Sequence, residues 1–193
     1  MKLFAILTFS FLIIALCENC RDTGSGSKKT DETFVQPTDV QGVSCSYVVY
    51  YDDGKMKSCV LAREDTLSGQ SLPLGTIVFF SRDGVMESCF LQRDTEIQGH
   101  LCKGRSDNWS TAFHPNGELK LAWLAKDEII QDVPCASASF WKDAFGSGAG
   151  TYFFADGKLR GCKLAQDATV GGLSFRKGDH VAFEENGKVK AGR

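Results

Sequence analysis

A pattern of alternating apolar residues that runs into an Asp-Gly or Asn-Gly pair occurs five times along this chain. In every copy the residue four positions before the glycine is aromatic, the residue six positions before it is β-branched, and the residue two positions after it is Met, Leu or Val. Successive copies are 30, 33, 40 and 30 residues apart, and their glycines are Gly54, Gly84, Gly117, Gly157 and Gly187. Such self-similarity predicts a fold built by stacking one supersecondary unit.

Each copy predicts a β-hairpin, because alternating β-branched and aromatic residues beside Asp-Gly or Asn-Gly are a strong hairpin signal. We expect a three-residue loop that ends in a glycine bulge, such as residues 82–84. This register sets each aromatic residue opposite the Met, Leu or Val beyond the glycine, as a cross-strand apolar pair. A two-residue loop would instead set the aromatic residue opposite a charged one: Lys57, Glu87, Lys120 or Arg160.

Each hairpin is followed by a short link of the form Leu-x-x-Asp/Glu-x-x-apolar, often with Gly next, as in residues 91–99 and 164–172. Each unit therefore predicts two or three short strands, and none has the period of a helix. A stack of hairpins can bury a continuous apolar face that one hairpin cannot. The sequence predicts an all-β domain of stacked hairpin repeats over residues 38–193, forming a meander or solenoid-like sheet, and leaves closure into a barrel open.

The N-terminal twenty residues predict an export signal. Lys2 precedes an apolar run over residues 3–16, which is the length of a signal-peptide core and short for a membrane span. The run ends in Cys17, and residues 14–17 resemble the relaxed lipobox of spirochaete lipoproteins; Cys20 is the second candidate. The resemblance implies that a fatty acyl chain such as palmitate on one of these cysteines holds the protein in a membrane. An ordinary cleaved secretory signal is the alternative.

Residues 21–37 are polar and rich in Gly and Ser, which predicts a flexible tether between the signal segment and the repeat domain. We therefore expect the protein at the cell envelope, as an outer-membrane or periplasm-facing lipoprotein, with secretion as the alternative. The net charge of −2 is spread without a basic patch, so a nucleic-acid partner is not expected.

Six cysteines follow the tether and fall into two sets of equivalent repeat positions. Other repeats carry Ala, Leu or Phe at these positions, which indicates buried apolar thiols. Export favours disulfides instead, with three bridges that each join one member of each set as the obvious arrangement. Both alternatives stay open, and no spacing predicts a metal site. The first set is Cys59, Cys89 and Cys162, and the second is Cys45, Cys102 and Cys135.

No catalytic or cofactor-binding fingerprint occurs in the chain, so we expect neither an enzyme nor a cofactor. His114 occupies a turn position that other repeats fill with unrelated residues, which favours a structural role. Four acids recur three residues after the leucine of each link, and we expect them to cap turns; a ladder of weak Ca²⁺ sites is the alternative. These acids are Glu64, Asp94, Asp127 and Asp167.

The third repeat carries an insertion over residues 136–150 that includes Phe140, Trp141 and Phe145. Aromatic insertions in repeat proteins often mark the binding side, so this segment is a candidate binding loop. A surface insertion that covers the sheet edge is the alternative.

The segments over residues 48–56 and 152–159 resemble MORN-type hairpin repeats, which also stack hairpins around an aromatic-x-x-Asn/Asp-Gly turn. The resemblance implies a scaffold or interaction module and transfers no catalytic residue. We therefore expect a membrane-tethered envelope lipoprotein whose repeat domain binds a protein or a glycan. The alternatives are a structural envelope protein without a specific ligand and a carbohydrate-acting enzyme that uses the insertion.

Overall fold

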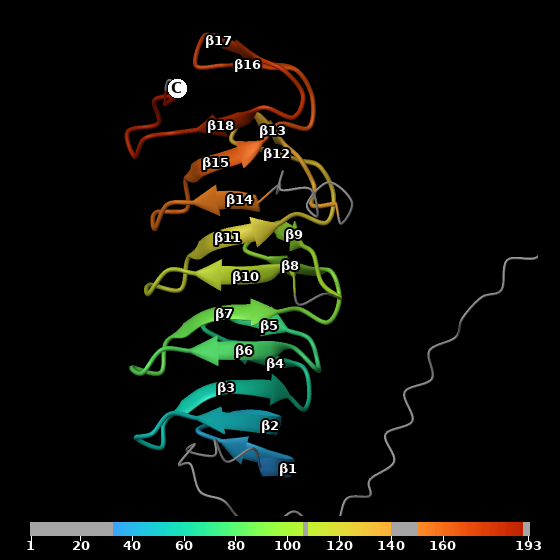
Figure 1. Ribbon diagram of the computed structural model, residues 1–193, viewed down its shortest axis with the longest axis vertical. Helices are drawn as coiled ribbons and strands as arrows, with labels where there is room; N and C mark the ends of the chain where they lie inside the picture. Colours follow the sequence, from blue (N-terminus) through green and yellow to red (C-terminus); the bar gives the residue numbers. More distant parts are fainter. Residues whose placement is uncertain (1–32, 106–107, 140–149, 191–193) are drawn as a thin grey trace, which may run out of the picture. The chain divides into compact units, whose positions relative to one another are not determined.

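The computed structural model describes residues 33–105, 108–139 and 150–190, and all of their regular structure is β-strand (Figure 1). One antiparallel sheet of ten strands runs through the repeats, and each of four two-stranded hairpins follows one of its long hairpins along the chain. The prediction of an all-β meander of stacked hairpin repeats is confirmed. The sheet is open in the described residues, because β1 and β18 each have one hydrogen-bonded neighbour.

The strands of the main sheet follow one another in the order of the chain, and each strand between the two edges pairs with the sheet strand before it and the one after it. Its strands are β1 (Thr33–Val40), β2 (Val43–Tyr50), β3 (Met56–Leu61), β6 (Ile77–Phe80), β7 (Met86–Phe90), β10 (Ser110–Phe113), β11 (Leu119–Trp123), β14 (Gly150–Phe153), β15 (Leu159–Lys163) and β18 (His180–Ala182).

The turns of the long hairpins have the expected register. Phe80 pairs with Met86, and the turn between them is closed by hydrogen bonds from Ser81 N to Val85 O at 2.8 Å and from Gly84 N to Ser81 O at 3.0 Å. Gly84 has a φ of 78°, a conformation that favours glycine. The register shift beside each aromatic residue leaves one extra residue on the second strand, and these bulged residues are Lys57, Glu87, Lys120 and Arg160.

The links are themselves hairpins, so that each complete unit has four strands where the sequence analysis expected two or three. The added pairs are β4 (Asp65–Leu67) with β5 (Gln70–Leu72), β8 (Thr95–Ile97) with β9 (His100–Cys102), β12 (Glu128–Ile130) with β13 (Val133–Cys135), and β16 (Ala168–Val170) with β17 (Leu173–Phe175). Their two-residue turns have positive φ at both positions, as at Gln98 (50°) and Gly99 (82°), which is the backbone of a type I′ turn.

The core lies between one face of the main sheet and the short hairpins. A leucine from each unit is almost fully inaccessible: Leu61, Leu91, Leu124 and Leu164 are 0–1% exposed. Apolar residues of the short hairpins, including Leu72, Ile97 and Ile130, belong to the same buried cluster. Each short hairpin therefore covers the inner face of the sheet, and the stack shares one continuous core.

The sheet begins at Thr33, five residues before the boundary that the sequence assigned to the repeat domain. The backbone of β1 pairs with β2 from Thr33 opposite Val48 to Val40 opposite Val43. Its register shifts between Phe34 and Thr38, around Pro37, which has no N–H to donate to a ladder. The polar composition that predicted a tether up to residue 37 therefore includes the start of an edge strand.

Candidate functional site

Of the six cysteines that the structure describes, one pair is joined and the other four are buried thiols. A disulfide links Cys135 of β13 to Cys162 of β15, with their Cα atoms 5.7 Å apart. It therefore joins one cysteine from each of the two sets of equivalent repeat positions. The remaining thiols are Cys45, Cys59, Cys89 and Cys102, all 0–1% exposed. Burial raises the pKa of Cys89 and of Cys102 to about 12, which keeps both thiols protonated and unreactive near neutral pH.

His100 and His114 make contacts between neighbouring repeats. His114 Nε2 donates to the Phe153 carbonyl at 3.0 Å, across to the next long hairpin. His100 Nδ1 lies 3.1 Å from a carboxylate oxygen of Glu128, and the other oxygen of Glu128 accepts from Leu101 N at 3.0 Å. The pair thus joins β9 to β12. The small hollow beside His100 has no Ser, Cys or Lys in its lining that could serve as a nucleophile.

The recurring acids close the links. Asp94, Asp127 and Asp167 each accept a hydrogen bond from the backbone N–H ten residues further on, at 2.9, 2.7 and 2.7 Å. The equivalent Glu64 reaches Arg93 at 2.9 Å instead, because its longer side chain extends to the next repeat. Within the described ranges no group of three or more His, Cys, Asp or Glu side chains could hold a metal ion.

Two groups of expected residues lie outside the part of the chain that the structure describes. They are the lipidation candidates Cys17 and Cys20, and the candidate binding loop with Phe140, Trp141 and Phe145. Among the described residues there is no helix of the length and apolar character needed to cross a membrane.

The face of the main sheet that points away from the short hairpins is also apolar. Successive strand residues point to opposite faces, so the residues between the buried ones lie on this side. Large apolar side chains occupy it on six strands, and all are only partly buried or exposed. We call this set the outer face: Tyr47, Val60, Ile77, Phe79, Phe90, Leu121, Trp123 and Tyr152.

Much of the outer face is contiguous across strands. Tyr47 pairs with Val60, Val60 with Ile77 and Ile77 with Phe90, so one row crosses β2, β3, β6 and β7. The rings of Phe79 and Phe90 meet edge to face with centroids 5.7 Å apart. Further along the sheet Leu121 pairs with Tyr152, which is 41% exposed. These contacts make ordered apolar patches on one face of the sheet rather than scattered exposed residues.

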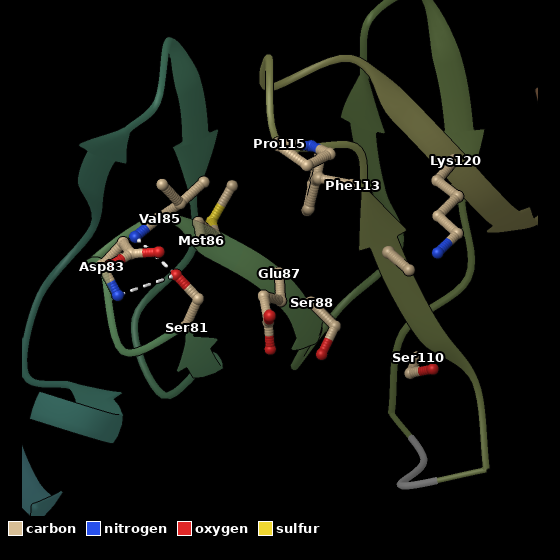
Figure 2. A pocket seen from close by; sticks show the side chains of 11 residues that line it. Ser81, Asp83, Val85, Met86, Glu87, Ser88, Ser110, Phe113, Pro115 and Lys120 are labelled. Atoms are coloured by element: carbon tan, nitrogen blue, oxygen red, sulfur yellow. Dashed lines mark hydrogen bonds between the residues drawn. The ribbon is translucent and has the colours of Figure 1, made fainter. Parts of the chain in front are cut away.

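A hollow of about 610 Å³ separates the Phe79 and Phe90 end of the outer face from the Leu121 and Trp123 end. Small residues of β7 and β10 line it, namely Ser88, Ser110 and Ala112, together with the turns at residues 81–85 and at Pro115. Figure 2 shows Glu87 and Ser88 on one strand of the hollow and Lys120 on another. The hollow could receive one side chain of a partner, with an acid and a base beside it.

The bulged residues add charge along the turn side of the outer face. Three of the four are cations, Lys57, Lys120 and Arg160, and all four are exposed. The Arg160 guanidinium lies 6.0 Å from the Phe154 ring centre, and the Lys57 ammonium 5.9 Å from that of Tyr51. The bulged residues therefore place three cations and one acid along this side of the outer face, although the whole chain has a net charge of −2.

The outer face cannot be found by aligning the repeats. The positions that stay apolar in every repeat are the ones that point into the core. Outer-face positions vary between repeats: Ile77 and Ser110 are equivalent, as are Phe79 and Ala112. One sequence signal did indicate an apolar outer face. A strand with one solvated face alternates apolar and polar residues, whereas residues 77–80 are apolar throughout.

Comparison with known proteins found no matching protein-family model, no matching curated protein and no matching solved structure. The resemblance to MORN-type repeats and to bacterial lipoproteins therefore stays a prediction from the sequence.

Proposed function

We propose that this chain is a non-catalytic binding module whose outer face docks a partner protein, and that a lipid on Cys17 or Cys20 holds the module at a cell envelope. The observation that carries the proposal is the set of ordered apolar patches on the side of the sheet opposite the core. The core already has its own cover in the short hairpins. A second apolar face on the same sheet is therefore explained by a partner rather than by folding.

The side chains of the outer face favour a protein partner of defined character. Tyr, Trp and Phe are enriched in the centres of protein interfaces, and Lys and Arg at the border fix orientation through charge. Lys57, Lys120 and Arg160 would attract carboxylates around the edge of an apolar patch. We therefore propose a partner surface that is apolar at its centre and acidic at its border.

The absence of catalysis is part of this proposal. In the described residues, His100, His114 and the recurring acids form contacts within the scaffold, and the hollow beside His100 has no Ser, Cys or Lys in its lining. Tethering rests on the N-terminal pattern of the sequence alone. A structural envelope protein without a specific ligand would need no such ordered outer face, and a carbohydrate-acting enzyme would use the insertion over residues 136–150 instead.

Site-specific photocrosslinking in native cells tests both halves of the proposal. A photoreactive phenylalanine replaces Phe79 on the outer face or, as the control, Ile129, which is 75% exposed on β12 of a short hairpin. After irradiation, the membrane fraction is analysed by intact mass. We expect one discrete protein adduct from position 79, none from position 129, and an acyl chain on the N-terminal cysteine.

Two results would contradict the proposal separately. Equal adducts from both positions, or a glycan adduct at position 79, would remove the protein-docking role of the outer face. An N-terminal peptide without an acyl group would make the chain a secreted protein and remove the tether, whatever the crosslinks show.

A further inference from the structure

The disulfide between Cys135 and Cys162 has a defined place in the repeat. Cys135 forms a bridge of antiparallel backbone pairing with Leu164, and Cys162 lies two residues before that leucine. Both side chains point into the core between the sheet and the short hairpin, and both are 0% exposed. With their Cα atoms 5.7 Å apart, the two residues are within the usual span of a disulfide.

The first repeat places two cysteines in the same way. Cys45 is paired with Leu61, the leucine equivalent to Leu164, and Cys59 lies two residues before Leu61. Both cysteines are thiols in the structure, and Cys45 Sγ lies 3.4 Å from the Val43 carbonyl oxygen. Cys45 is 0% exposed and Cys59 is 1% exposed, so a thiol reagent in solution does not reach either side chain in the folded chain.

We propose that Cys45 and Cys59 form a second disulfide, equivalent by register to Cys135–Cys162, and that Cys89 and Cys102 stay as thiols. The repeat positions of the last two explain the difference. Cys102 is paired with Leu124, but Ala122 stands two residues before that leucine. Cys89 lies two residues before Leu91, and no cysteine is paired with Leu91 in the described strands.

The reaction needs a disulfide oxidant, such as oxidised glutathione. The Cys45 thiolate attacks one sulfur of the oxidant and releases one glutathione thiol; the Cys59 thiolate then attacks the Cys45 sulfur and releases the second. Two protein thiols thus become one disulfide, while one oxidant disulfide becomes two thiols. Burial raises the pKa of both cysteines, so we expect the bond to form during folding, before the core closes over them.

The test folds the full chain in mixed oxidised and reduced glutathione, then blocks thiols with N-ethylmaleimide in denaturant and maps tryptic peptides. Lys55 and Lys57 lie between Cys45 and Cys59, so trypsin separates the two cysteines and a bond appears as a linked peptide pair. Cys59→Ala and its matched control Cys89→Ala replace equivalent repeat positions with the residue that Ala122 shows is tolerated there.

We expect two linked pairs in the unaltered chain and in Cys89→Ala, and only the Cys135–Cys162 pair in Cys59→Ala. Recovery of Cys45 and Cys59 as blocked thiols in unaltered chains whose Cys135–Cys162 peptides are linked would overturn the proposal. A link from Cys45 to Cys89 or Cys102 would overturn it as well. Because the map of the unaltered chain decides the question, failure of one variant to fold does not affect the outcome, and neither does the identity of any partner.

Discussion

Leu124→Ala is expected to lower the free energy of unfolding by about 2–5 kcal/mol, the range for removing a buried leucine side chain from a packed core. Leu124 is 0% exposed and is paired with Cys102, at the place where the short hairpin of β8 and β9 meets the main sheet. Truncation would leave a cavity that the fixed register of the sheet prevents from collapsing. Because each repeat is stabilised by its neighbours, the loss should also weaken the adjacent units.

Urea unfolding followed by circular dichroism measures this effect. Leu74→Ala is the matched control, since it removes the same atoms from a leucine that is 58% exposed, and its effect should stay within about 0.5 kcal/mol. Equal losses in the two variants would mean that the short hairpins do not cover the sheet as described.

Alkaline pH is expected to destabilise the chain through its buried thiols. Burial raises the pKa of Cys89 and Cys102 to about 12 in the folded chain, whereas an unfolded cysteine ionises near its ordinary value of about 8.5. Between pH values of about 8.5 and 12 the folded state binds more protons than the unfolded state. The contribution of each thiol to the free energy of unfolding is therefore fully present below about pH 8.5 and is lost as the pH rises. The slope is about 1.4 kcal/mol per pH unit for each thiol.

The measurement compares urea unfolding at pH 8, 9 and 10 for the unaltered chain and for Cys89→Ala. Lysine and tyrosine titration is common to both, so the difference isolates one thiol. We expect the stability of the variant to fall less steeply with pH, by about 1.4 kcal/mol per unit at the alkaline end. Parallel pH profiles would show that Cys89 is not a buried neutral thiol.

The long hairpins could be predicted from the sequence because their turns and their registers depend on residues that are close together. The fixed spacing from Phe80 through Gly84 to Met86 allows one register that pairs the apolar residues, and the structure has it. The short hairpins were harder to predict. Their strands have three residues each, which is too short for alternation to show, and one of their four turns, Gln131-Asp132, has no glycine.

The cysteine pairing and the outer face depend on how segments meet in space. Sequence spacing sorted the cysteines into two sets but could not place Cys135 opposite Leu164, since that bridge joins a short hairpin to the main sheet. The outer face was hidden for a different reason. Its residues vary between repeats, as Phe79 and Ala112 do, and only the strand register shows that they lie on one face.

The most direct test of the account is the adduct yield from a photoreactive residue at position 152, at the exposed end of the outer face. The yield is compared between the unaltered chain, the double variant Phe79→Ser and Leu121→Ser, and the control variant Ile129→Ser on a short hairpin. Loss of central apolar anchors commonly weakens a protein interface by 2 kcal/mol or more, so we predict that the double variant lowers the yield at least about tenfold. The Ile129 variant should leave it unchanged, and equal yields from all three chains would contradict docking through this face.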